Sequence, residues 1–261
     1  MLSSRTLTLV ALLTSAPGAA AQEASQNEAN NPLTPKLTIN LQNYYVPDVS
    51  GLPGNRWANQ FLLRGLIPIE ISNIPQLFRF TLPIATAPDY NGGYQTGIGD
   101  LTLIDLIPMP LGGGRTLAVG PVVVLPTATD DLLGTGKLQL GAAAALIAPQ
   151  EWGLLGGLVT YQASVAGSSH RPETSLMTIQ PIVNYNLSNG FYLRSSAIMS
   201  FDFEGDVNYV PVGFGIGKVW KVSDGVTANA FIEPQYTVWR EGVGAPEWQI
   251  FAGVNFQFSV E

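Results

Sequence analysis

The chain has no cysteine, only one histidine and few charged residues. The absence of cysteine excludes disulfides, a thiolate nucleophile and cysteine-ligated zinc. Charged residues make up 12% of the sequence and hydrophobic residues 46%, whereas the usual charged share is about 25%. Beyond position 21 no apolar run reaches the roughly 20 residues that a membrane-spanning helix needs. The hydrophobicity must therefore be dispersed along the chain, as it is when apolar and polar residues alternate in β-strands.

Residues 1–21 have the features of a cleaved signal peptide. Arg5 supplies a positive charge, residues 7–13 (LTLVALL) are apolar, and residues 19–21 (AAA) suit a cleavage site. We predict that the mature chain begins at Gln22, with an uncleaved anchor as the alternative. Cleavage removes one of the 12 Lys and Arg and none of the 19 Asp and Glu, so the formal charge becomes −8. This acidic balance argues against a nucleic-acid partner, because phosphate binding needs basic patches.

Residues 22–35 are polar, rich in Asn and interrupted by two prolines, and we expect a flexible periplasmic lead-in. Residues 36–261 have a hydrophobic period of two and form one expected domain. Between 226 and 239, for example, Ala228 and Ile232 share one face while Asn229 and Glu233 share the other. The count is least secure at 96–107 and 137–148. About twelve strands are predicted, over 37–46, 58–70, 76–86, 96–107, 115–125, 137–148, 153–166, 175–187, 190–203, 207–221, 225–239 and 247–259.

The predicted connections alternate between long polar loops and tight turns. Residues 47–57 and 126–136 are long links, whereas Asn189-Gly190 and Asp224-Gly225 are strong signals for two-residue hairpins. Membrane barrels have short turns on the periplasmic side and longer loops outside. A soluble β-sandwich would show the same strand period without a reason for this alternation. The pattern therefore favours an all-β fold, a transmembrane antiparallel β-barrel in the outer membrane of a Gram-negative bacterium.

Two further features bear on this prediction. Only helices and closed barrels satisfy every backbone polar group in lipid, and an even strand number puts both termini on one side. Aromatic residues lie near many expected strand ends, as interfacial girdles require. The last aromatic residue of the final expected strand is Phe258, three residues before the C-terminus, whereas outer-membrane barrels usually end on an aromatic residue. We interpret the last residues as a short extension of an intact strand.

Short glycine-rich segments resemble a known family. They are Gly97-Ile98-Gly99-Asp100-Leu101-Thr102, Leu125-Pro126-Thr127 and Gly134-Thr135-Gly136-Lys137. Together they resemble the outer-membrane family of meta-pathway phenol-degradation proteins, also described as transporters. The resemblance covers most of residues 33–259. It implies a channel-like barrel that takes up small hydrophobic or aromatic molecules.

Polar and charged residues on the inward faces of the expected strands are the main functional candidates. A charge facing lipid near the bilayer centre would cost about 2–4 kcal/mol, so such residues belong in the lumen. They would either set the electrostatics of a pore or form a salt-bridge network that fills a narrow barrel. The candidates are Arg64, Arg79, Asp100, Gln180, Asn184, Arg194, Asn229, Glu233 and Gln235.

Three other groups of residues are weaker candidates for a functional site. Asp202, Glu204 and Asp206 could share a face and bind Ca²⁺, but a solvated acidic loop explains them better. The segment 134–137 lacks the first glycine and the final Ser or Thr of a phosphate-binding loop. His170 lies beside Ser168 in an expected loop with no third catalytic group. We expect no cofactor, no metal and no catalytic site.

The leading hypothesis is a passive outer-membrane channel for small hydrophobic or aromatic solutes. A non-conducting structural or adhesive barrel is the alternative, and a lipid hydrolase that depends on Ser168 or His170 is the third. The expected partners are outer-membrane lipids and lipopolysaccharide, the solute and the barrel-assembly machinery. Solute identity, oligomeric state and whether the lumen is open stay undetermined by the sequence.

Overall fold

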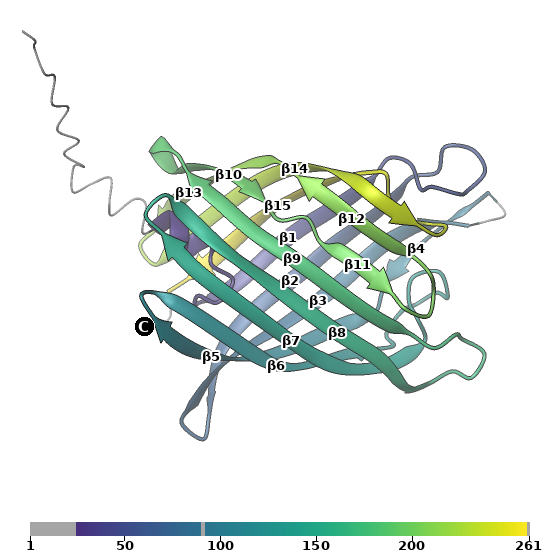
Figure 1. The fold of residues 1–261 in the computed structure, drawn as a ribbon, viewed down its shortest axis with the longest axis horizontal. Helices are drawn as coiled ribbons and strands as arrows, with labels where there is room; N and C mark the ends of the chain where they lie inside the picture. The colour runs from purple at the N-terminus through teal and green to yellow at the C-terminus, as the bar shows by residue number, and fades with distance from the viewer. Residues whose placement is uncertain (1–24, 90–91, 260–261) are drawn as a thin grey trace, which may run out of the picture.

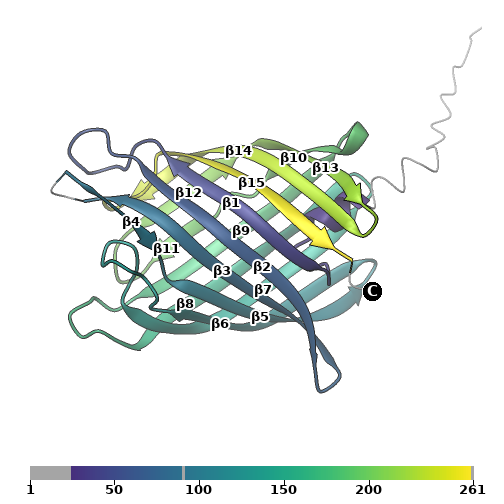
Figure 2. The ribbon, with the colours of Figure 1, turned by 180° about the vertical axis from the view of Figure 1, so that it is seen from behind.

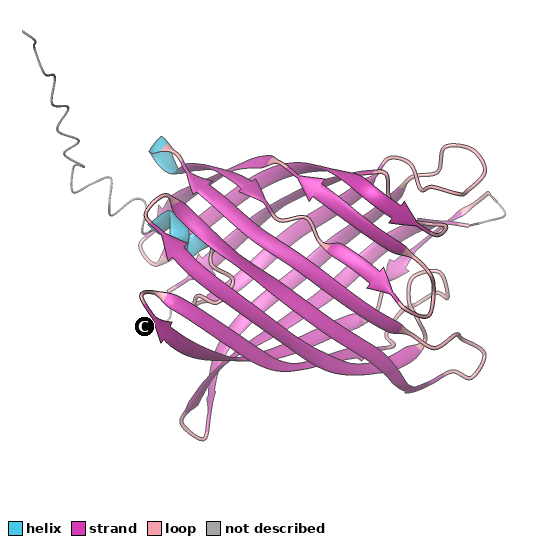
Figure 3. Ribbon diagram, in the orientation of Figure 1, coloured by secondary structure: helices cyan, strands magenta, loops and turns pink. Residues whose placement is uncertain are grey.

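The computed structural model describes residues 25–89 and 92–259, most of them in one antiparallel sheet (Figures 1 and 3). A helix over 25–30 and the 3-10 turn η1 (Ser188–Gly190) are the helical parts of this described chain, and neither is long and apolar enough to span a membrane. The predicted signal peptide lies outside the described residues. The strands are β1 (Leu37–Val46), β2 (Ala58–Ile71), β3 (Ile74–Pro88), β4 (Tyr94–Ile98), β5 (Leu101–Gly112), β6 (Arg115–Leu125), β7 (Lys137–Gln150), β8 (Gly153–Gly167), β9 (Ser175–Asn186), β10 (Phe191–Ser195), β11 (Met199–Asp202), β12 (Asn208–Gly213), β13 (Gly215–Ser223), β14 (Val226–Glu241) and β15 (Trp248–Phe258).

The sheet closes into a barrel of twelve antiparallel strands, as the sequence predicted. β1 pairs with β2 on one side and with β15 on the other, and this second pairing closes the ring (Figure 2). Three of the twelve barrel strands are divided into two pieces, β4 with β5, β10 with β11 and β12 with β13. The fourth expected strand, 96–107, is therefore present, but it starts earlier, ends later and is interrupted.

The alternation of long and short connections is confirmed. Ser72 and Asn73 have φ of 52° and 62°, and Asn189 has φ of 60°, so tight hairpins close one end of the barrel. This short-turn end also holds the last described residues and the helix over 25–30, whereas the longer loops gather at the opposite end, the loop end (Figure 1). In an outer-membrane barrel the short-turn end faces the periplasm.

The outer face of the barrel is apolar. Alternate residues of each strand point outward, so Ile250 is 39% exposed while its neighbours Gln249 and Phe251 are buried. Glycine on this face can be covered by an aromatic ring from the next strand, because a Cβ on Gly65 would lie 2.2 Å from the Phe80 ring. An apolar exterior around a closed ladder is the surface that lipid requires.

Residues 25–35 of the predicted lead-in make defined contacts with the barrel. The helix over 25–30 lies at the short-turn end of the barrel (Figure 3), and its side chains form hydrogen bonds with the barrel wall. Gln26 donates to the carbonyl oxygens of Leu187 and Phe191 at 3.2 and 2.8 Å. Leu33 is 5% exposed and joins the interior apolar cluster. A polar, Asn-rich segment resembles a disordered one in composition, but here its amides find partners on the lumen wall.

Candidate functional site

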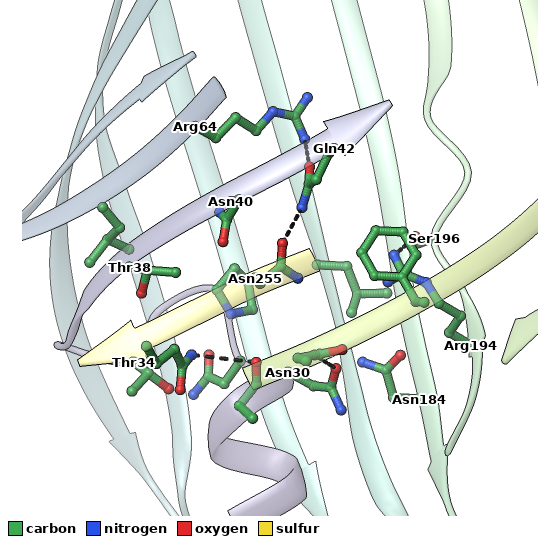
Figure 4. Close-up of a pocket in the computed structure, with 18 of the residues that line it drawn as sticks. Asn30, Thr34, Thr38, Asn40, Gln42, Arg64, Asn184, Arg194, Ser196 and Asn255 are labelled. Carbon is green, nitrogen blue, oxygen red and sulfur yellow. Dashed lines mark hydrogen bonds between the residues drawn. The ribbon is translucent and has the colours of Figure 1, made fainter. Parts of the chain in front are cut away.

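The barrel interior holds two cavities, one toward each end. The loop-end cavity has a volume of about 470 Å³ and is lined by residues that include Tyr44, Asn59 and Tyr209. The short-turn cavity has a volume of about 140 Å³ and is lined largely by amide side chains (Figure 4). Arg64 belongs to the lining of both cavities. The candidate site is the lumen that these two cavities define.

The N-terminal segment forms one wall of the short-turn cavity. Asn30 accepts a hydrogen bond from Asn229 on β14 at 2.8 Å, and Gln257 on β15 donates to the carbonyls of Glu28 and Ala29 at 3.4 Å. The segment therefore narrows the lumen at the short-turn end, held by hydrogen bonds from strands far away in the sequence.

A chain of polar side chains runs from Arg64 across the first and last strands. Arg64 Nη1 donates to Gln42 Oε1 at 2.8 Å, and Gln42 Nε2 donates to Asn255 Oδ1 at 2.9 Å (Figure 4). β1 pairs with both β2 and β15, which brings the three residues onto one stretch of wall. The alternation of β-strands places all three on the lumen side.

Glu233 lies fully buried at the centre of a second polar cluster. Its Oε2 accepts from Arg194 Nε at 2.7 Å and from Ser196 Oγ at 2.8 Å, while its Oε1 accepts from the Ser196 backbone N–H at 2.8 Å. Gln235 Nε2 also donates to Oε1 at 3.0 Å, and Gln249 Nε2 donates to Gln235 Oε1 at 2.6 Å. A buried carboxylate with four donors is well compensated for the loss of water.

This cluster sits where the barrel wall is interrupted. β10 ends at Ser195 and β11 begins at Met199, and the neighbouring strand is divided at Phe214. The Glu233 carboxylate crosses the intervening strand at Gly213, where a Cβ would lie 2.1 Å from Oε1. Glycine at 213 therefore makes room for a carboxylate that bonds a backbone N–H left without a ladder partner.

Aromatic rings cover the Arg194 side of the lumen. The Arg194 guanidinium carbon lies 3.6 Å from the centre of the Phe231 ring and 5.4 Å from that of Phe251. The Tyr44 ring stacks on Phe251 at 4.2 Å between centroids. Arg194 thus combines an ion pair with a cation–π contact, and the lumen presents an apolar aromatic surface beside its amides.

Eight of the nine predicted lumen residues fall into two groups. Arg64, Arg79 and Arg194 line the short-turn cavity together with the predicted amides Gln180, Asn184 and Asn229. Glu233 and Gln235 are fully buried in the carboxylate cluster. All eight belong to the inward faces of their strands.

Asp100, the ninth predicted lumen residue, lies at an interruption of its strand. It occupies the break between β4 and β5 and accepts hydrogen bonds from the backbone N–H and hydroxyl of Thr135 at 2.7 and 2.9 Å, and from Ala128 N–H at 3.2 Å. Its carboxylate thus fixes the loop 126–136 against the wall. The short strand pattern around 96–107 gave no sign of this break.

Sequence reasoning missed several residues of the lumen. Asn30 and Gln26 were assigned to a flexible segment, and Tyr192, whose hydroxyl donates to Asn229 Oδ1, was passed over. Gln42 and Asn255 alternate with apolar residues on their strands and could have been found from that pattern. The Asn-rich composition of 22–35 was the only signal for the N-terminal segment.

The remaining groupings carry no site. Asp202 Oδ1 accepts the backbone N–H groups of Glu204 and Gly205, so this carboxylate stabilises a turn. In the part of the chain that the structure describes, no cluster of three His, Cys, Asp or Glu is suited to a metal ion. The His170 backbone N–H donates a hydrogen bond to Ser168 Oγ, and both residues are exposed.

The pKa of one carboxylate in a loop, that of Glu173, is shifted by its neighbours. Hydrogen bonds from Lys137 Nζ and Ser164 Oγ, each at 2.6 Å, lower the pKa of Glu173 below its usual value. Lys137 is almost fully buried while Glu173 is mostly exposed. Glu173 therefore reaches from the loop to neutralise a lysine at the loop end of the lumen.

Two solved structures share this fold. The COG4313 outer membrane channel from Pseudomonas putida F1 matches with a TM-score of 0.66 at 14% identity, covering 88% of this chain and 98% of that chain. The NanC porin matches with a TM-score of 0.50 at 12% identity, covering 86% of this chain and all of that one. No family model and no curated protein matches the chain. The chain therefore has the fold of outer-membrane channels, and the resemblance to meta-pathway phenol-degradation proteins stays a prediction.

Proposed function

We propose that the chain is an outer-membrane channel for the passive entry of small hydrophobic or aromatic molecules. The observation that carries this proposal is the pair of cavities inside a closed barrel, both of them lined in part by Arg64. A solute would enter the larger cavity between the loops and leave through the smaller one. The Tyr44, Phe231 and Phe251 rings offer it apolar contacts on the way. Transport would be diffusive.

A second candidate function has its own support. Hydrogen bonds from Gln26 and Asn27 hold the N-terminal helix in the short-turn end, where it narrows the lumen. A barrel closed in this way would serve the envelope as a structural or adhesive protein. The two functions differ in whether this helix leaves a path for solute.

Reconstitution distinguishes the two. We would place the mature chain in liposomes and measure swelling with phenol, benzyl alcohol and a disaccharide, beside a variant that carries Gln26→Ala and Asn27→Ala. A channel should pass the aromatic solutes faster than the disaccharide. If only the variant conducts, the helix gates the barrel. If both are folded, as a shift between boiled and unboiled samples on a gel would report, and neither conducts, the channel proposal is wrong.

A further inference from the structure

The charges in the lumen do not balance. Glu233, the one fully buried carboxylate described, is paired with Arg194. Asp100 bonds the loop 126–136. Asp105 alternates with Ile104 and Leu106, which pack in the interior cluster, and it therefore lies on the outer face. In the described chain no carboxylate pairs with Arg64 or Arg79, which leaves two uncompensated positive charges beside the short-turn cavity.

Both arginines have unused hydrogen-bond donors. The Arg64 side chain forms one hydrogen bond within the described residues, to Gln42, and its Nε is buried without a partner. The Arg79 side chain forms no hydrogen bond or ion pair with the residues that the structure describes, yet it lines the cavity. A guanidinium carries five N–H donors in a geometry that matches a carboxylate. Two such groups on one cavity therefore call for an anion.

The strand register places the two arginines close together. Arg64 on β2 is opposite Thr81 on β3, and Arg79 is opposite Leu66. Arg64 and Arg79 are thus diagonal neighbours on the lumen face, and the Cα atoms of such neighbours are about 7–8 Å apart. Like charges at this spacing repel each other, and a bound anion between them would relieve that repulsion.

The rest of the cavity suits an anion with an apolar body. Asn40 is opposite Arg64 in the register with β1, and Asn184 and Asn255 add further amide donors. Leu66, Ile182 and Phe231 form the apolar part of the lining. The volume of about 140 Å³ is close to that of an engineered cavity of about 150 Å³ that binds benzene. One six-membered ring therefore fits.

We propose that Arg64 and Arg79 form a binding site for the carboxylate of a small single-ring organic acid, and that the lumen favours anions. This inference rests on the proposed channel function for its transport consequence, but not for the binding itself. It narrows the expected solute from any small aromatic compound to one with an ionised acid group.

Binding and selectivity test the proposal separately. The probe pair is benzoate and uncharged benzyl alcohol, which differ in charge at nearly equal size. The variants are Arg64→Gln, Arg79→Gln and the two together, and the matched control is Arg115→Gln, because Arg115 is exposed at the turn between β5 and β6. Calorimetry in detergent measures binding, and the reversal potential in a salt gradient measures ion preference.

We expect the wild-type protein to bind benzoate more tightly than benzyl alcohol and to prefer chloride over potassium. Each single variant should weaken benzoate binding about tenfold or more, the ratio for one lost charged hydrogen bond. The double variant should lose the anion preference, and the control variant should keep both properties. Benzyl alcohol flux should change little in any variant.

The outcomes separate this proposal from the function. A folded wild-type barrel that binds benzoate but passes no solute would refute the channel and leave the site standing. A barrel that passes both probes equally, with no benzoate binding and no effect of either substitution, would refute the site and leave the channel standing. Equal loss in Arg115→Gln would also refute it, since that residue is outside the lumen.

Discussion

The two sides of the barrel hold their shape by different means. From β5 to β8 the half of the interior face toward the short-turn end is apolar, and Leu106, Val122, Ile147 and Leu154 pack together in one cluster. From β10 to β15 the interior face buries the polar side chains Asn229, Glu233 and Gln235 beside the aromatic rings of Phe231 and Phe251. The first side has long paired strands β6 to β8, whereas the second contains two interrupted barrel strands.

The difference shows where each side can carry function. The apolar side draws its stability from the burial of methyl and methylene groups, which need no specific partner. The polar side depends on pairing its buried donors and acceptors, and the Glu233 cluster does so with Arg194, Ser196 and Gln235. Polar groups fixed by one another are rigid enough to select a solute. Stability and selectivity are thus separated around the barrel.

The largest loss of stability is expected from Glu233→Gln on the polar side. It leaves the Arg194 charge 11% exposed and unpaired, and loss of one partner from a buried pair costs about 3–5 kcal/mol. Denaturant unfolding in micelles, followed by tryptophan fluorescence, would measure the loss. The control is Glu247→Gln, whose pair with Arg240 is partly exposed and should contribute about 0–1 kcal/mol. Equal effects of the two substitutions would contradict the assignment of the cluster.

A slightly smaller effect is expected on the apolar side from Leu154→Ala. Leu154 is fully buried, and such a truncation costs about 2–5 kcal/mol. We expect about 2–3 kcal/mol, at the lower end of that range, because water from the lumen can enter the space. The control is Leu155→Ala, the next residue along β8, which faces outward and is 44% exposed. The same unfolding assay applies, and a larger effect at Leu155 would reverse the assigned faces.

The barrel could be predicted from the sequence because its strands and turns are determined by residues that are neighbours in the chain. A period of two fixes the face of each residue, as at Asn229 and Glu233, and the hairpin signals at Asn189-Gly190 and Asp224-Gly225 fix where strands turn. The chosen strand ranges agree with the observed ones to within a few residues, apart from 96–107. These features depend on neighbours in the sequence, which is why a single chain reveals them.

The lumen contacts could not be predicted because they depend on residues far apart in the chain. Gln26 bonds to Phe191, and Arg64 reaches Asn255 through Gln42, across contacts that only barrel closure creates. The same holds for Asp100, whose partner is Thr135 in a loop. The pattern identified which side chains point inward but gave no information on which of them pair and which stay free.

A smaller effect separates hydrogen bonding from packing on the polar side. Tyr192→Phe keeps the ring, which is fully buried, and removes the hydroxyl that donates to Asn229. An acceptor left unpaired in the interior costs about 1–3 kcal/mol, and we expect the lower part of that range because Asn229 keeps its bond to Asn30. Tyr185→Phe on the outer face is the control, expected to change stability by less than about 0.5 kcal/mol. No difference between the two would mean that the hydroxyl contributes nothing.

The smallest effect concerns pH and the loop end, where the two sides of the barrel meet solvent. Hydrogen bonds from Lys137 and Ser164 lower the pKa of Glu173, so this carboxylate stabilises the fold above its unfolded pKa, about 4.3. That contribution is lost as the pH falls through the lowered folded value, because protonated Glu173 no longer neutralises the buried Lys137. Unfolding of wild-type protein and Glu173→Gln, measured between pH 7 and pH 3, should therefore differ at neutral pH and converge in acid. A constant difference across that range would mean that the charge of Glu173 is not what links this loop to the barrel.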